Sequence, residues 1–398
     1  MTTTTIERPK TKLKIIDADT HLTEPHDLWT KRAPAALRER VPQVKMHQGQ
    51  MSWVIDGDKS IGFGAHPSSA ILKDGSKIRA IDKFLKLQFA DVHLGSSQVK
   101  ERLAVMDETG IYAQIVYPNI LGFGGQAAAK VDSALRLSCV EMYNDAMAEI
   151  QQESGQRLFP MALLPWWDVK AAVKETERTH KLGLRGININ SDPHTHKAED
   201  GANIPDLASQ HWNPLWEACA ALDMPINFHI GGSEQSTDWL GQQGWPSLPR
   251  DLKAAIGGAM LFFNNGRVLS NIIYSGTLDR FPKLKFVSVE SGIGWVPFML
   301  EALDYQLKEI AEGRRFELKP SEYFRRNFYA CFWFEQVDIS NTLRHVGIDN
   351  ALFETDFPHP TGLYPIDNLE ARLSGLTPEE RSKVLSTNAA KLYKIPLQ

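Results

Sequence analysis

The sequence has few cysteines, no long apolar run and no excess of positive charge. Its three cysteines, Cys139, Cys219 and Cys331, are far apart and form no CxxC pair, which argues against a disulfide framework and a thiolate zinc site. No segment approaches the roughly 20 apolar residues of a membrane span, and residues 1–8 lack the apolar core of a signal peptide. With 44 basic against 48 acidic residues, a formal charge of −4 gives no reason to expect nucleic acid or an anionic membrane as partner. We therefore expect a cytoplasmic protein that acts on a small molecule.

Eight short apolar runs alternate with segments of helical period. The apolar runs cover residues 13–19, 112–117, 159–164, 186–189, 225–229, 285–290, 328–331 and 351–356. The helical segments cover residues 98–108, 127–153, 169–181, 214–222, 252–265, 295–312, 338–346 and 378–392. Strands that alternate with helices indicate an α/β fold with a parallel sheet, and eight such units predict a distorted (β/α)8 TIM barrel. An open doubly wound sheet is the alternative, but the chain lacks the GxGxxG and Walker A motifs that often accompany it.

The chain is expected to form one barrel domain over residues 13–398, preceded by a disordered lead over residues 1–12. The stretch 31–97 is long for a connection between a strand and a helix, so it is predicted to be an insertion after the first strand. Within it, Trp53–Asp56 followed by Gly57 indicates a small hairpin. This segment could form a lid over the mouth of the barrel.

Residues of the kind that bind metals fall at the ends of four predicted strands. These are Asp17, Asp19 and His21 after the first strand, His229 after the fifth, Glu290 after the sixth and Asp356 after the eighth. Because the carboxyl ends of the strands share one rim in a barrel, these side chains should converge. Alternation along the first strand would place Asp17, Asp19 and His21 on the same side. Imidazole with carboxylates suits zinc, iron or manganese, and leaves positions free for water or substrate.

Several motifs together resemble one known family. They are IIDADTHLTEP, FHIGG, LDRFPKLKFVSVESGIGW, FETDFPHP and NAAKLYKI. The sequence resembles the amidohydrolase-related family, the branch of the amidohydrolase superfamily that includes metal-dependent aromatic-acid decarboxylases, from Ile15 to Ile395. The resemblance implies a distorted barrel with a divalent metal at its mouth. It matches the family's first-strand His-x-His to Asp19-Thr20-His21 and its strand-five histidine to His229. The strand-eight aspartate, which binds metal and handles protons in the family, is matched by Asp356.

Glu290 departs from the family pattern, because many members have a histidine after strand six. That histidine serves as an acid/base group or electrophile, whereas a glutamate could bridge a second metal. With Asp19, Asp356 and either Asp17 or Glu24, the site would be rich in carboxylates, which favours iron or manganese over a single zinc. A paired Fe/Mn centre could activate dioxygen. In this respect the sequence resembles an amine or amino-acid N-hydroxylase with two related subunits.

Three further candidates near the metal ligands have structural alternatives. His359, three residues after Asp356, could be a ligand, an outer-shell donor or an acid/base group, or could simply be solvated. Glu24 could orient His21 through a hydrogen bond, or could begin a helix. Asp17 could bind metal, or could hold the neighbouring backbone.

Candidate substrate contacts lie elsewhere in the sequence. Arg185, just before the fourth strand, could pair with a substrate carboxylate or fix the barrel floor. Tyr117 and Trp166 follow the second and third strands and could form the pocket wall or only its packing. His194 and His196 form an HxH pair in a loop, for which we expect a role at the surface or the pocket edge.

These residues support three hypotheses. The first is a metal-dependent enzyme with one Zn or Mn that acts on a small organic acid or amide. In hydrolysis Asp356 would take a proton from an activated water, and in non-oxidative decarboxylation it would protonate the substrate carbon. The second is a dinuclear Fe/Mn oxygenase that uses Glu290 as a ligand. The third is a non-catalytic scaffold subunit, against which the intact ligand set argues. A homo-oligomer, or a hetero-oligomer with a related subunit, is expected.

Overall fold

Parallel strands form the centre of the molecule. The computed structural model describes residues 13–61, 64–235 and 247–397, so the predicted lead over residues 1–12 lies outside the described residues. One sheet has the order β1 (Ile15–His21), β5 (Ile111–Tyr117), β6 (Leu158–Pro160). The other has the order β12 (Ala351–Phe353), β11 (Phe328–Phe332), β10 (Phe286–Val289), β9 (Ile226–His229), β8 (Ile187–Asn188), β7 (Ala162–Leu163). Neighbouring strands in both sheets are parallel, which confirms the α/β class.

Backbone hydrogen bonds link the two sheets at both junctions. The Met161 amide donates to the Val116 carbonyl (2.9 Å), while the next amide, Ala162, donates to Gly186 (3.0 Å) in the other sheet. At the second junction, the Asp356 amide donates to the Asp19 carbonyl (2.9 Å). The residues that follow β12 therefore lie beside the end of β1.

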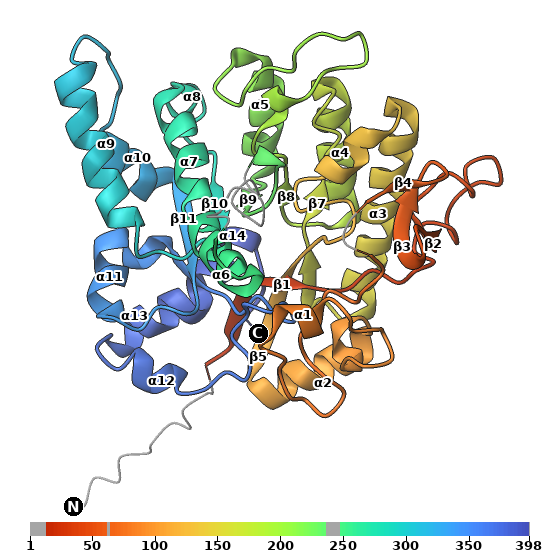
Figure 1. Ribbon diagram of the computed structural model, residues 1–398. Helices are drawn as coiled ribbons and strands as arrows, with labels where there is room; N and C mark the ends of the chain where they lie inside the picture. The colour runs from red at the N-terminus through yellow and green to blue at the C-terminus, as the bar shows by residue number, and fades with distance from the viewer. Residues whose placement is uncertain (1–12, 62–63, 236–246, 398) are drawn as a thin grey trace, which may run out of the picture.

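Helices lie around the strands (Figure 1). They are α1 (Ile81–Phe84), α2 (Val99–Thr109), α3 (Ser133–Glu153), α4 (Val169–Leu182), α5 (Asn213–Leu222), α6 (Arg250–Leu261), α7 (Asn264–Tyr274), α8 (Thr277–Arg280), α9 (Val296–Ile310), α10 (Pro320–Asn327), α11 (Ile339–Val346), α12 (Leu369–Arg372), α13 (Pro378–Ser382) and α14 (Asn388–Tyr393). A π-helical turn, Lys383–Thr387, joins the last two. Each predicted helical segment contains a helix. Among the described residues, none of these helices is long and apolar enough to cross a membrane.

Local sequence explains where these helices begin and end. Asp168 begins α4 because its carboxylate accepts the amides of Lys170 (2.9 Å) and Ala171 (3.1 Å). The helix ends at Gly183, whose φ of 97° lies in the left-handed region that glycine adopts at low cost. Such caps fix the lengths of the helices between the strands.

A small antiparallel sheet occupies part of the 31–97 stretch. It consists of β2 (Gln43–His47), β3 (Gln50–Ile55) and β4 (Lys59–Ser60), which confirms a hairpin there. It lies at the right-hand edge of the view, beside α3 (Figure 1). Trp53 of β3 packs edge-on against Trp29, with ring centroids 5.7 Å apart. The hairpin is thus anchored to the residues that follow β1.

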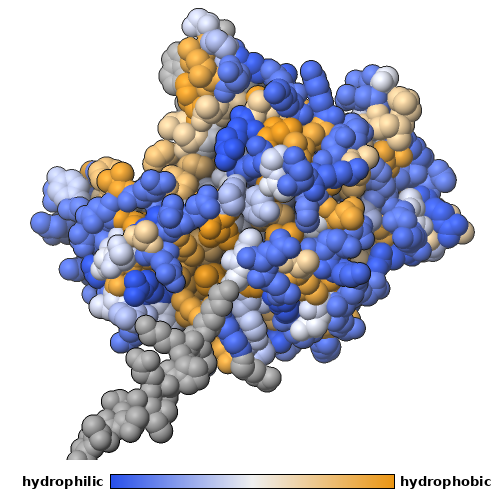
Figure 2. Space-filling view, turned by 90° about the horizontal axis from the view of Figure 1, so that it is seen from below, coloured by the Kyte–Doolittle hydropathy of each residue, from blue (hydrophilic) through white to orange (hydrophobic). Residues whose placement is uncertain are grey.

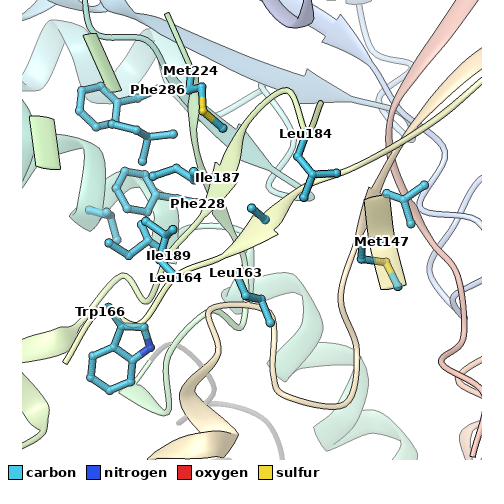
Figure 3. Close-up of a cluster of buried hydrophobic side chains, with 14 of the residues drawn as sticks. Met147, Leu163, Leu164, Trp166, Leu184, Ile187, Ile189, Met224, Phe228 and Phe286 are labelled. Carbon is cyan, nitrogen blue, oxygen red and sulfur yellow. The ribbon is translucent and has the colours of Figure 1, made fainter. Parts of the chain in front are cut away.

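Two apolar layers form the main core. The larger layer lies between strands and helices, where Phe228 and Phe286 from neighbouring strands stack at 5.9 Å (Figure 3). The smaller layer comes from the opposite face of the strands and includes Ile16, Ile115 and Val287. Outside, the face seen from below is mostly hydrophilic, with apolar patches between charged residues (Figure 2).

Candidate metal centre

Metal-ligating side chains from four strand ends meet in the molecule. Asp19, His21, His229 and Glu290 each offer one ligand atom within 4.8 Å of the others. A second group contains His21, Glu290, Asp356 and His359, so the two groups share His21 and Glu290. The structure therefore brings together all five residues that were predicted to bind metal, along with His359.

The two histidines at the centre present ring nitrogen atoms to one another. His21 Nε2 lies 3.1 Å from His229 Nε2, and each of these atoms is 3.6 Å from Asp19 Oδ1. His229 Nδ1 lies 2.7 Å from the carbonyl oxygen of Ile230, which places the ring proton on Nδ1 and leaves Nε2 free. Burial holds the pKa of His21 well below its usual value, so this ring is neutral. Imidazole nitrogens arranged in this way can donate electron pairs to a cation.

Asp19 is the clearest sign that a cation belongs here. Its side chain is fully buried, and neither carboxylate oxygen accepts a hydrogen bond from any described residue. Burial, with the nearby Asp17 carboxylate, raises the pKa of Asp19 well above its usual value. A buried carboxylate that accepts no hydrogen bond costs several kcal/mol. A divalent metal held by Asp19, His21 and His229 would offset that cost, so these residues fit a metal ion.

Glu290 and Asp356 complete the cluster from backbone conformations that are rare for residues with side chains. Their φ angles are 53° and 55°, in the left-handed region. The Glu290 amide donates to Glu354 Oε2 (3.2 Å), and Glu290 Oε2 lies 3.4 Å from His229 Nε2. Burial is the main cause that raises the pKa of both carboxyl groups. The nearby Asp356 carboxylate raises the pKa of Glu290 further, and the nearby Asp19 carboxylate raises that of Asp356. The backbone strain therefore serves to direct two carboxylates toward the histidines.

The predicted position of Asp17 was wrong. A bulge in β1 between Asp17 and Thr20 interrupts the alternation, so Asp17 does not share the side of Asp19 and His21. Its carboxylate instead accepts the Thr355 amide (2.7 Å), the Thr355 hydroxyl (2.6 Å) and the Gln114 amide group (3.2 Å). Asp17 thus holds neighbouring backbone, which was its structural alternative.

Glu24 lies next to the site, but it does not orient His21. Its Oε1 accepts the amides of Asn119 (2.7 Å) and Ile120 (3.2 Å), and Asn119 Oδ1 lies 2.9 Å from His359 Nε2. The hydrogen-bond partners of Glu24 lie in the segment after β5. Through one of them, Asn119, Glu24 is connected to His359 and not to His21.

His359 belongs to the cluster and is not a solvated loop histidine. Its ring stacks on His21 at 3.8 Å, and its Nδ1 lies 2.9 Å from Asp356 Oδ1. Burial lowers the pKa of His359 to about 4. A neutral His359 is well placed to share a proton with Asp356.

The structure does not bring Arg185 to the cluster. Its guanidinium donates to the carbonyl of Lys394 (2.5 Å), near the amino-terminal end of β8, which favours the barrel-floor alternative. Tyr117 lies closer, with its ring 5.2 Å from His229, and its buried hydroxyl donates to Asn227 Oδ1 (3.1 Å).

Trp166 lies in another buried region, whereas His194 of the HxH pair is exposed and His196 is partly buried. Trp166 is fully buried and its ring is 4.9 Å from that of His196. Neither His194 nor His196 belongs to a group of metal-ligating side chains within the described residues. The pair therefore does not form a second metal site with its neighbours there.

Two residues of the site were not predicted. The Phe123 ring lies 4.3 Å from His229 and 5.2 Å from His21, and so covers both histidines. The Thr361 hydroxyl lies 3.0 Å from Asp356 Oδ2 and 3.3 Å from Glu290 Oε1. The glycines around Phe123 were a usable signal: a Cβ on Gly124 would come within 2.2 Å of the Gly232 carbonyl, so this loop must pass close to another.

A family comparison agrees with the motifs and the geometry. Residues 16–395 match the family model described as Amidohydrolase. The chain belongs to the amidohydrolase family.

Solved structures share the fold of this amidohydrolase. An amidohydrolase from Mycobacterium avium subsp. paratuberculosis K-10 is 22% identical, with a TM-score of 0.74 over 96% of this chain and 100% of that chain. A dihydroxybenzoic acid decarboxylase from Polaromonas sp. JS666, solved with manganese and the inhibitor 2-nitroresorcinol, is 19% identical, with a TM-score of 0.57 over 96% and 97%. These likenesses show a mixed α/β fold with parallel sheets of the amidohydrolase type.

One characterised relative matches over part of its length. The 2-keto-4-carboxy-3-hexenedioate hydratase of Sphingobium sp. (strain NBRC 103272 / SYK-6) is 26% identical over 108 residues. The match spans 26% of this chain and 30% of the hydratase.

Proposed function

We propose that this amidohydrolase is a metal-dependent enzyme that removes CO2 from a small organic acid. The observation that carries the proposal is the fully buried Asp19 carboxylate, which faces two histidines and accepts no hydrogen bond from the described residues. Similarity to a manganese-containing decarboxylase supports the reaction class. We further propose that the strands close into a distorted (β/α)8 barrel, with residues 31–97 as an insertion.

The metal ligands would be Asp19, His21 and His229, with Glu290 or Asp356 completing the set. A divalent ion bound there would act as a Lewis acid and anchor the carboxylate of the substrate. Phe123 packs against both histidines and would limit the access of water to them.

Asp356 would supply the proton for the reaction. When the bond between the substrate carbon and its carboxylate breaks, CO2 leaves and the electron pair stays on carbon. The carbon then takes a proton from Asp356, whose raised pKa favours the protonated form. His359, with Nδ1 2.9 Å from Asp356 Oδ1, is placed to relay a proton from water to that carboxylate after the reaction.

CO2 release tests this proposal. Protein stripped of metal and reloaded with manganese or zinc is incubated with a panel of hydroxybenzoic and unsaturated carboxylic acids, beside Asp356→Asn as control. Stoichiometric CO2 release that needs both metal and Asp356 is expected. Turnover of an amide or ester by the metal-loaded protein, without CO2 release from any acid, would show a hydrolase instead.

A dinuclear Fe/Mn oxygenase is the second candidate. The observation in its favour is the pair of overlapping ligand groups that share His21 and Glu290, because one glutamate between two sets of donors is suited to bridge two ions. Oxygen uptake by protein loaded with iron and manganese, together with two metal ions per chain, would support it. One metal ion per chain would exclude it.

A further inference from the structure

A cavity lies against the metal-ligating cluster. It has a volume of about 480 Å³ and is lined by residues that include Lys77, Arg79, Trp333, Thr361, Tyr364 and Arg372. Thr361 also bounds the cluster, because its hydroxyl lies 3.0 Å from Asp356 Oδ2 and 3.3 Å from Glu290 Oε1. Thr361 therefore belongs both to the cavity wall and to the surroundings of two of the proposed metal ligands.

Two side chains of the cluster are partly exposed. Asp19, His229 and Asp356 are 0% exposed, whereas Glu290 is 8% and His359 is 11% exposed. Of the two exposed side chains, Glu290 is the one whose carboxylate the Thr361 hydroxyl approaches.

Positive charge dominates the cavity wall. Lys77, Arg79 and Arg372 line it, against the single carboxylate of Asp367. Lys77 is half-buried and its ammonium group donates to the Gly362 carbonyl, so it is held in place. Arg79 is exposed on the same segment. Two cations are thus presented to an anion that enters the cavity.

Aromatic side chains line the cavity. Trp333 is buried, and its indole nitrogen donates to the Thr361 carbonyl (3.2 Å). Phe334 packs edge-on against Trp333, with ring centroids 4.7 Å apart, and is 46% exposed. Arg372 donates to the carbonyls of Trp333 and Glu335 (2.9 Å to Glu335) and so holds this segment in place. A planar ligand can pack on the exposed Phe334 ring.

We propose that this cavity binds the second carboxylate of the substrate, so that the enzyme prefers flat acids that carry two carboxylates. One carboxylate would face the cluster past Thr361, while Lys77 and Arg79 hold the other. This inference rests on the proposed function, because it assumes that the first carboxylate is anchored at the metal.

Calorimetric titration of manganese-loaded protein with isophthalate and benzoate tests the inference, since the two acids differ by one carboxylate. Isophthalate is expected to bind about ten-fold more tightly than benzoate. Arg79→Met and Lys77→Met should each remove most of this difference and change benzoate binding less than about two-fold. Lys77→Arg should restore the preference, because it keeps the charge.

Lys73→Met is the matched control, because it removes an exposed lysine of the same segment that does not line the cavity. It should bind both acids as the wild type does. Equal binding of the two acids to wild type, no binding of either acid, or unchanged binding in Arg79→Met and Lys77→Met would overturn the inference. Metal-free protein separates the two proposals: if it binds both acids as tightly as the manganese-loaded form while still preferring isophthalate, the metal anchor fails and the cavity assignment stands.

Discussion

Polar side chains at the two ends of the parallel strands differ in how far the protein satisfies their hydrogen bonds. At the amino-terminal end, Arg157 donates to the carbonyls of Ile111 and Tyr112 (both 2.9 Å) and to the Asp107 carboxylate (2.7 Å). At the carboxyl-terminal end, Asp19 is fully buried and its carboxylate has no partner among the described residues. Arg157 is satisfied by the protein itself, whereas the Asp19 carboxylate accepts no hydrogen bond from the described residues. The contrast predicts opposite effects of substitution at the two ends.

The largest effect is expected from Asp19→Ala. Metal content should fall to near zero and activity by a factor of about 10³ or more, because the ion supplies several kcal/mol of transition-state stabilisation. The metal-free form should be as stable as the metal-free wild type, or more stable, since an unpartnered buried carboxylate is removed. Metal analysis and thermal melting of metal-free samples check this. Wild-type metal content in Asp19→Ala, or in the parallel variants His21→Ala and His229→Ala, would refute the ligand assignment.

Asp356→Asn should separate metal binding from proton transfer. Activity should fall by about 10²- to 10⁴-fold, because an amide cannot deliver the proton. Metal content should fall far less, since the amide oxygen can still coordinate. Turnover rates are compared at full metal loading. Activity within a few-fold of wild type would remove Asp356 from the mechanism.

Glu354 offers a smaller effect at the same end. Glu354→Leu leaves the buried Glu290 amide without its acceptor, which should lower the free energy of unfolding by about 1–3 kcal/mol. The variant should also weaken metal binding, because Glu290 loses the hydrogen bond that holds its backbone. Glu354→Gln keeps an acceptor oxygen and should restore both. Urea unfolding and metal titration of the two variants test this prediction. Equal stability and equal metal affinity of Glu354→Leu and Glu354→Gln would show that Glu354 does not act through this hydrogen bond.

The smallest effect is expected at the amino-terminal end. Arg157→Ala removes three hydrogen bonds from a partly exposed side chain and should lower the free energy of unfolding by about 1–2 kcal/mol. Metal content and activity should not change. Arg185→Ala, which loses one hydrogen bond to the Lys394 carbonyl, should lower the free energy of unfolding by less than Arg157→Ala does. Loss of metal in either variant would mean that the two ends are not independent.

Local patterns in the sequence predicted most of the fold. Apolar runs and helical spacing depend on neighbouring residues, so the strands and helices could be located to within a few residues. The run 159–164 is divided between β6 and β7, because Met161 bonds back to β5 while Ala162 bonds across to Gly186. That exchange of partners depends on distant segments and leaves no local signal.

The convergence of the metal-ligating residues could also be predicted, because strand ends share one rim in this architecture. The direction of the Asp17 side chain could not be predicted, since the bulge that turns it away is set by the pairing of β1 with β5. The partner of Glu24 is Asn119, 95 residues away, and no spacing rule connects them. The oligomer, the related partner subunit and the cytoplasmic location stay predictions.

Metal content of the wild-type protein tests the central claim most directly. The protein is produced in medium supplemented with iron, manganese and zinc, and the metals are counted per chain beside Glu290→Ala. The account predicts at least one tightly bound divalent metal per wild-type chain. One ion in both proteins supports the decarboxylase, and a fall from two ions to one in Glu290→Ala supports the bridged centre. A wild-type chain that holds no metal, even after reconstitution, would contradict the account and favour the scaffold hypothesis.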